Sequence, residues 1–170
     1  MTFVLIDPPL AEPVSLAQAK AHLRVGHGDE DALISSLIIA ARRLVEARTG
    51  LALMPQGWKL LLDDWPEDGV VKLPLAPVIS VDEVKAGAVV SPALYVDDAP
   101  GRRVVMLERV KPQAVVNGIE IKVTAGFAAV PEPLCQAMLQ LVAHWFEYRG
   151  AQDAPLQVAT LLAPFREMKI

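Results

Sequence analysis

Cysteine is almost absent from this sequence, and its scarcity excludes several classes of protein. A single cysteine in 170 residues excludes an intramolecular disulfide, and three histidines beside it are too few for a structural zinc site. No segment approaches the ~18 to 20 consecutive apolar residues of a membrane span. The first residues, MTFVLIDPP, lack the basic start and the long apolar run of a signal peptide. We therefore expect a protein that is made in the cytoplasm without a targeting segment.

Clusters of positive charge are also missing. The chain has 16 Lys and Arg against 20 Asp and Glu, a formal net charge of −4, and it has no long basic run. Tight binding to a nucleic-acid backbone needs clustered Lys and Arg. The composition therefore argues against a protein that grips DNA, although DNA could still pass close to it.

Apolar residues, by contrast, are abundant. They make up 53% of the sequence, and the mean hydropathy is +0.35, which is high for a soluble chain of this length. Because no membrane span is present, this apolar surface must be buried by the fold or by partner subunits.

Two helices are expected near the N-terminus, at residues 14–25 and 29–49. Ser15 and Gln18 have the Ser-x-x-Gln spacing of a capping box, which marks the start of the first helix. The two glycines of the stretch VGHG would end it. Acidic residues open the second helix, arginines lie toward its end, and Gly50 suits its C-terminus.

The second helix has an apolar stripe at helical spacing, which predicts its buried face. The centre of the stripe is Leu33, Leu37, Ala41, Leu44 and Ala47 or Arg48, and Ile34, Ile38 and Val45 widen it.

The pattern changes to short, partly alternating segments within residues 56–126. They are rich in Val and Ile and are separated by Pro, Gly and Asp, which predicts about five antiparallel strands. A long helix at 131–149 follows, and then a short helix that Pro164 breaks. The order predicts an α+β fold: one domain over residues 1–154 and a separate C-terminal segment, 155–170.

The only cysteine lies in the long C-terminal helix together with a histidine, so a catalytic thiol has to be considered. Cys135 and His144 are nine positions apart, which at ~100° per residue puts them on opposite faces of the helix. They cannot form a thiolate–imidazolium pair there. We interpret Cys135 as a packing residue.

The same helix has only a narrow polar stripe, formed by Gln136, Gln140, His144 and Glu147. The rest of its surface is apolar and includes Trp145, Phe146 and Tyr148. A helix that is apolar over most of its circumference must be covered on most sides. In a chain this short, a neighbouring subunit is a natural source of part of that cover.

Three charged motifs could carry chemistry, but each has a simpler explanation. GHGDED at 26–31 lacks the glycine pattern and lysine of a phosphate loop and the spacing of a calcium loop, so helix capping explains it better. DDWPED at 63–68 is interpreted as a hairpin tip between strands, and RRVVMLERVK at 102–111 as a surface of mixed charge. We expect no catalytic site and no cofactor.

Several segments, taken in order, resemble the head–tail connector (adaptor) proteins of long-tailed phages, prophages and gene transfer agents. They are SLAQAKAHLR at 15–24, DEDALI at the start of the second helix, TAG before the long C-terminal helix, HWFEYR at its end, and LLAPFR near the C-terminus. The likeness runs from Pro13 to Arg166, and the region around residues 85–117 matches only in character.

The resemblance implies a structural protein of the head–tail junction. Such adaptors form a ring of about a dozen subunits beneath the portal protein. The ring extends the channel through which double-stranded DNA passes, without sequence-specific binding, and docks the stopper or tail proteins. Two alternatives are a stopper or neck protein of the same particle, and a small enzyme or ligand-binding domain with an acidic site.

The C-terminal segment 155–170 is expected to dock onto the portal or an adjacent subunit. It follows the polar stretch AQDAP, and its helix is too short to be stable alone. The candidate interface residues of the whole chain are Trp145, Phe146, Tyr148, Val158, Leu161, Leu162, Phe165 and Arg166.

Overall fold

The chain forms two compact units, each with its own core. A computed structural model describes residues 2–64, 66–67, 70–87, 89–90, 93–98, 101–106, 118–148 and 154–166. The strand unit comprises Met1–Leu10 and Met54–Phe127, and the helical unit comprises Ala11–Leu53 and Ala128–Ile170. The single domain expected over residues 1–154 thus differs from the observed division. The strands and the helices bury separate apolar faces, and the chain crosses between the two units three times.

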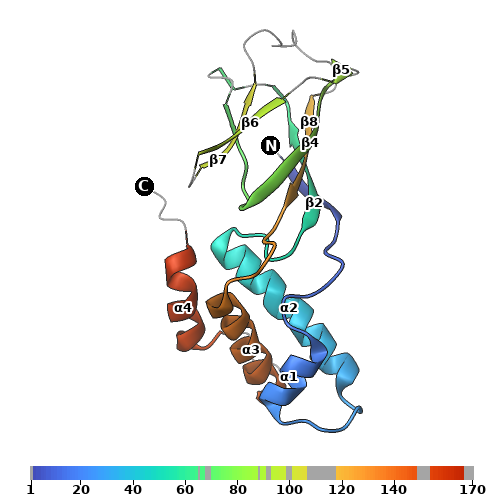
Figure 1. The fold of residues 1–170 in the computed structure, drawn as a ribbon, viewed down its shortest axis with the longest axis vertical. Helices are drawn as coiled ribbons and strands as arrows, with labels where there is room; N and C mark the ends of the chain where they lie inside the picture. The colour runs from blue at the N-terminus through green and yellow to red at the C-terminus, as the bar shows by residue number, and fades with distance from the viewer. Residues whose placement is uncertain are drawn as a thin grey trace. The chain divides into compact units, whose positions relative to one another are not determined.

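The described part of the strand unit contains two antiparallel sheets (Figure 1). The five-stranded sheet has the order β1-β2-β8-β4-β5, and the three-stranded sheet has the order β3-β7-β6. The strands are β1 (Thr2–Asp7), β2 (Gln56–Leu62), β3 (Val70–Lys72), β4 (Val78–Ala86), β5 (Val89–Val90), β6 (Ala93–Asp98), β7 (Gly101–Met106) and β8 (Ile119–Ala125). The α+β class and the antiparallel character of the central region are confirmed.

Strand β1 was not predicted from the sequence. It pairs with β2, with Thr2 opposite Leu61 and Phe3 opposite Leu60. Phe3 stacks on Trp58 of β2 with ring centroids 4.6 Å apart and planes nearly parallel. The apolar start of the chain is therefore an edge strand of the larger sheet.

Strand β8 shows how alternation divides the larger sheet into two faces. Ile119, Ile121 and Val123 are buried, whereas Glu120 and Lys122 between them point the other way. Successive side chains of a strand point to opposite faces, so one face is apolar and the other polar. The buried cluster on the apolar face includes Leu60, Val71, Leu73, Val84, Ala86, Ile119, Ile121 and Val123, with Val71 contributed by the smaller sheet.

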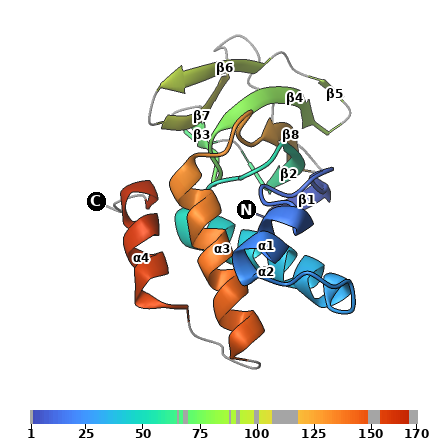
Figure 2. The ribbon, with the colours of Figure 1, turned by 60° about the horizontal axis from the view of Figure 1, so that its bottom comes forward.

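The helical unit is a small bundle. It contains α1 (Leu16–Leu23), α2 (Asp31–Thr49), α3 (Glu132–Glu147), α4 (Leu156–Leu162) and the short 3₁₀ turn η2 (Ala163–Phe165). Helix α3 packs against both α2 and α4, and α4 runs alongside it in the opposite direction (Figures 1 and 2). None of the helices within the described residues is long and apolar enough to cross a membrane.

Helix α1 begins as predicted but ends earlier. The Ser15 side chain accepts a hydrogen bond from the Gln18 N–H at 3.2 Å, and the Gln18 side chain accepts one from the Ser15 N–H at 2.9 Å. Its C-terminal cap is Arg24 in the left-handed conformation with φ 59°, not one of the following glycines. The N–H groups of Arg24 and Val25 bond back to carbonyls of the last turn, which stabilises this ending.

The buried face of α2 follows the residues expected to widen its apolar stripe, and of the expected centre only Ala41 is fully buried. Ile34, Ile38 and Val45 are fully or nearly fully buried, whereas Leu33 is 37% exposed. Two adjacent stripes of this helix are almost equally apolar. Which stripe faces inward is decided by the position of the neighbouring helices α1 and α3, which the spacing does not reveal. The predicted C-terminal residue, Gly50, is correct and has φ 67°.

Candidate functional site

A largely buried ion cluster joins α2 to two neighbouring segments of the helical unit. Arg42 Nε donates to Glu12 Oε2 and Arg42 Nη1 donates to Glu46 Oε2, both at 2.8 Å. The other oxygen of Glu46, Oε1, accepts the backbone N–H of Leu53 at 3.0 Å. The Arg42 side chain is only 6% exposed. The cluster holds two segments outside the helix against α2. Because its members bond to one another, it is structural rather than a ligand site.

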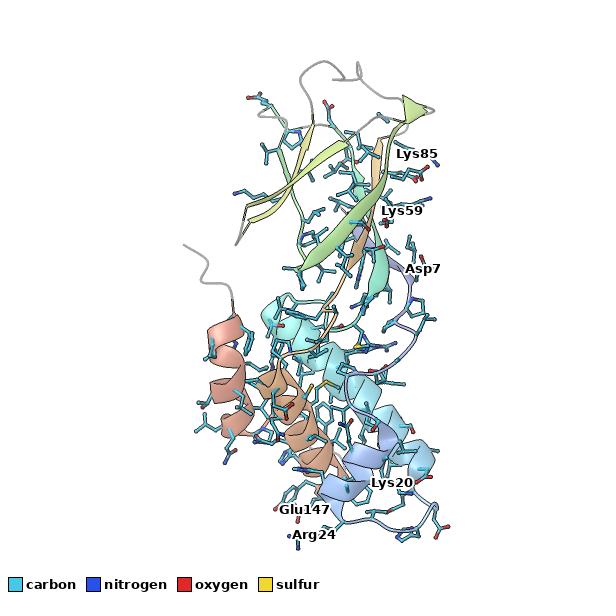
Figure 3. The ribbon with its side chains drawn as sticks, viewed as in Figure 1. Asp7, Lys20, Arg24, Lys59, Lys85 and Glu147 are labelled. Carbon is cyan, nitrogen blue, oxygen red and sulfur yellow. The ribbon has the colours of Figure 1, made fainter. Side chains whose placement is uncertain are left out.

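The outward face of the five-stranded sheet carries a network of paired charges, here called the polar ladder. Glu83 of β4 bonds through one oxygen to Lys122 of β8 and through the other to Lys85, each at 2.8 Å. Lys59 of β2 pairs with Glu120 of β8 at 3.3 Å. In Figure 3, Lys59 and Lys85 project from the same side of the strands.

Asp82 extends the polar ladder along β4. Its two oxygens accept hydrogen bonds from Ser80 Oγ at 2.6 Å and from Thr124 Oγ1 at 2.8 Å. With Asp82 included, the ladder has three carboxylates and three lysines, so its net charge is zero. The hydrogen bonds of Lys122 and Lys85 lower the pKa of Glu83, and the bond to Glu83 raises the pKa of Lys122. Both groups are therefore charged at neutral pH, and the ladder is a polar surface without net charge.

The predicted interface residues at the end of α3 lie at the surface. Trp145 and Phe146 are half-buried, and Tyr148 is 58% exposed. The Tyr148 ring packs against the His144 imidazole with centroids 5.2 Å apart. These aromatic side chains therefore leave apolar surface accessible at one end of the bundle.

The residues predicted on the C-terminal segment divide into two groups. Val158 and Leu162 are fully buried, because α4 packs against α3 of the same chain. They belong to the core of the helical unit and are not accessible to a partner. Leu161 and Phe165 are half-buried and Arg166 is exposed. Leu156, which is 81% exposed, is the most accessible apolar residue of α4, and the sequence analysis missed it.

Cys135 and His144 both lie on α3, so their opposite-face arrangement holds in the structure. Burial, and to a lesser extent the nearby carboxylate of Glu132, raises the pKa of the Cys135 thiol. A thiol with a raised pKa stays protonated at neutral pH and is a poor nucleophile.

The acidic motifs do not converge on a site in the described residues. Asp31 of GHGDED opens α2 and pairs with Lys20 of α1 at 2.6 Å, while the cap residue Glu30 makes no side-chain capping bond. Nowhere in the described ranges do three or more His, Cys, Asp or Glu side chains gather as metal ligands.

The other two motifs are only partly described. The segment DDWPED joins β2 to β3, which belong to different sheets, so it is not the hairpin tip that was expected. Its residues Trp65 and Asp68 lie outside the described residues, as do residues 107–111 of RRVVMLERVK. The first part of the latter motif is strand β7.

Comparison with known proteins identifies the family. Residues 13–88 match the family described as phage gp6-like head-tail connector protein. A chain in the neck of an empty gene transfer agent (GTA) particle, computed with C6 symmetry, is 30% identical with a TM-score of 0.85. The alignment covers 100% of this chain and 97% of that one. The chain belongs to the phage gp6-like head–tail connector family. Its membership in a structural family without enzymatic activity removes the small-enzyme alternative.

Two further structures resemble this connector over the same extent. One is a chain in the virion of the native GTA particle, at 30% identity and TM-score 0.85. The other is a chain in the neck of the native GTA particle computed with C12 symmetry, at 29% identity and TM-score 0.83. Each is covered to 97%, and each alignment covers 100% of this connector. A search of curated protein sequences finds no match.

Proposed function

We propose that this connector is a ring-forming subunit in the neck of a phage-like particle, where it joins the head to the tail. The observation that carries the proposal is the full-length similarity to a chain of a GTA neck, at 30% identity and a TM-score of 0.85. Because the alignment covers 100% of this chain and 97% of the other, the likeness extends over the whole backbone fold of both chains. Necks computed with C6 and C12 symmetry support a closed ring of copies.

The ring extends the channel for double-stranded DNA. The surface of a DNA channel must be hydrophilic but must not bind the DNA backbone. It must therefore lack clustered positive charge, which binds phosphates tightly. The polar ladder meets this requirement, because each of Lys59, Lys85 and Lys122 is paired with a carboxylate. The net charge of −4 further disfavours retention of DNA.

The C-terminal segment docks onto the portal protein or an adjacent subunit. Val158 and Leu162 anchor α4 to its own chain, whereas Leu156 of α4 and Arg166 after η2 are exposed. An exposed leucine at one end of this segment and a basic residue at the other suit a partner that offers both apolar and acidic contacts. Trp145, Phe146 and Tyr148 at the end of α3 offer aromatic contacts for a neighbouring subunit. The end of the ring that faces away from the portal receives the stopper or tail.

Electron microscopy of particles with and without the connector tests this function. We expect its deletion to leave DNA-filled or emptied heads that lack tails, and restoring the gene to recover complete particles. A fusion tag at the C-terminus should appear as extra density beneath the portal. Normal particles after deletion, or tag density at the tail tip or on the capsid, would overturn the proposal. A matched control is the tagged variant Cys135→Ser, which should occupy the neck normally.

A further inference from the structure

The outer face of α2 is exposed and nearly uncharged. At ~100° per residue its exposed side chains fall within about 120° of one another, away from the buried Ile34, Ile38 and Val45. They are Ala32, Leu33, Ser36, Ile39, Ala40, Arg43 and Ala47. Among these seven residues only Arg43 is charged, although the exposed side of a helix usually carries charged and polar residues. This face is therefore suited to being covered.

The chemistry of this face indicates what could cover it. Leu33 and Ile39 are 37% and 38% exposed, and the short side chains of Ala32, Ser36 and Ala40 lie around them. How closely a partner approaches a helix depends on the side chains at the contact, so short ones leave room for large ones. Arg43 makes no salt bridge within the described residues. The face thus lacks large apolar side chains and a negative charge.

The end of α3 offers both. Trp145 and Phe146 are half-buried, and Tyr148 is 58% exposed. Glu147 beside them is exposed, and it too makes no salt bridge in the part of the chain that the structure describes. Figure 3 shows Glu147 at the lower end of the helical unit, where α3 ends. Aromatic residues of this kind are enriched in protein interfaces.

We propose that the end of α3 in one connector subunit packs on the outer face of α2 in the next subunit. This contact rests on the proposed ring function and names the surfaces that join neighbouring copies. It places Tyr148 against the short side chains of α2 and Glu147 opposite Arg43. One chain cannot make the contact with itself, because its own α3 already packs on the inner face of α2.

The occupant is a second copy rather than a different protein, because the chain carries both halves of the match. The two surfaces complement each other in side-chain size and in charge, and opposite charges across an interface fix its register. A contact between two different patches is head-to-tail, and it closes into a ring when the rotation between copies divides the circle. Relatives occur in necks computed with C6 and C12 symmetry, in which each copy has a neighbour on either side.

Exchange of the two charges tests the contact. Arg43→Glu places two acids opposite each other, and Glu147→Arg places two bases there, so each should lower occupancy of the neck at least about tenfold. The double variant restores an opposite pair and should recover most of the occupancy. Both residues are exposed, so denaturation of the purified chains should show that all three variants fold. The control is Lys72→Glu, an exposed position of β3 in the strand unit.

The outcomes separate this contact from the ring function. Normal occupancy with both single variants, or a double variant no better than either single one, would overturn the contact and leave the proposed function standing. Absence of the wild-type connector from the neck would overturn the function and the contact together. Recovery in the double variant supports the contact, because Arg43 and Glu147 do not pair within one chain.

Cysteine cross-linking in assembled necks gives an independent test. In a Cys135→Ser background, which removes the only native thiol, one variant carries Ala40→Cys together with Tyr148→Cys, and two others carry the single substitutions. With a short flexible bismaleimide, we expect the double variant to give a ladder of dimers, trimers and higher products on denaturing gels. A mixture of the two single variants should stop at dimers. A dimer from Ala40→Cys alone would show a symmetric α2–α2 contact and overturn the proposal, as would the absence of cross-links from intact necks.

Discussion

Arg42 of α2 donates a hydrogen bond to Glu12 at 2.8 Å, although 30 positions separate the two residues. Glu12 lies just after the first crossing between the units, and Leu53, which bonds to Glu46 of the same cluster, lies just before the second. A single buried arginine on α2 therefore organises the two carboxylates that hold both crossing segments to the helical unit.

Removal of Arg42 should strongly destabilise the connector. Arg42→Ala removes the donor to Glu12 and one of the donors to Glu46, and breaking a buried ion pair in this way costs about 3–5 kcal/mol. Urea denaturation of Arg42→Ala and of a control, Arg43→Ala, gives their free energies of unfolding. Arg43→Ala is the matched control, since Arg43 is exposed and a surface substitution of this kind stays within about 0.5 kcal/mol. Equal stability of the two variants would refute the role of the cluster.

The capping box of α1 should contribute measurably to stability. Ser15→Ala removes the oxygen that accepts the Gln18 N–H, and the loss of such a cap costs about 0.5–2 kcal/mol. Ser36→Ala is the comparison, because the Ser36 hydroxyl only bonds back to the Leu33 carbonyl within α2. There alanine has the higher helix propensity, so the change should be neutral or slightly stabilising. The prediction fails if thermal unfolding shows the same midpoint for Ser15→Ala and the wild type.

Gly126 should tolerate no side chain. Its φ of +146° is rarely adopted by other residues, and an added Cβ would collide with the backbone carbonyl of Met54. Backbone strain of this type costs about 1–3 kcal/mol before the collision is counted. Gly126→Ala should therefore lose at least that much stability, whereas Gly26→Ala, where nothing lies within 4 Å, should lose far less. Comparable denaturation midpoints would contradict this expectation.

The polar ladder should make stability depend on pH at both extremes. The pKa of Glu83 is held below its ordinary value of 4.5, so its contribution is complete above 4.5 and is lost as the pH falls through the lowered pKa. The pKa of Lys122 is raised above 10.5, so its contribution is complete below 10.5 and is lost as the pH rises through the raised pKa.

Carbon-13 NMR of the carboxyl carbon can measure the Glu83 titration directly. We expect Lys122→Gln to return the pKa of Glu83 toward 4.5 by more than Lys85→Gln does, because the hydrogen bond from Lys122 is the larger cause of the shift. The reverse order, or an unshifted Glu83 in the wild type, would exclude the arrangement described here.

Two leucines of α4 should separate folding from attachment. Leu162 is fully buried, so Leu162→Ala should cost about 2–5 kcal/mol of stability. Leu156 is 81% exposed, so Leu156→Ser should leave the free energy of unfolding nearly unchanged while reducing occupancy of the neck. Denaturation of the purified chain and quantification of the connector in particles give the two readouts. Normal occupancy with Leu156→Ser would remove that residue from the docking surface.

Features set by nearby residues could be predicted, whereas those set by packing partners could not. The capping box of Ser15 and Gln18 and the C-terminal Gly50 were correct, because each depends on backbone groups a few positions away. The buried stripe of α2 was predicted in part. Ile34 is buried as expected but Leu33 is not, because both are strongly apolar and only the packing of α1 and α3 decides between them. Likewise, the apolar sequence of the short C-terminal helix predicted that Leu162 would contact a partner. It could not show that the same chain covers this residue.

By itself, the sequence determined the helices, the antiparallel strand region, the α+β class and the absence of a Cys135–His144 pair, because hydrophobic period and turn residues act locally. The family was also recognisable from its motifs in order. Only the tertiary structure decided the division into two cores, the strand order with β1 at one edge, the pairing of Arg42 with Glu12, and the alignment of the polar ladder. Each of these features joins residues that lie far apart in the chain, and whether such residues meet depends on how the helices and strands pack.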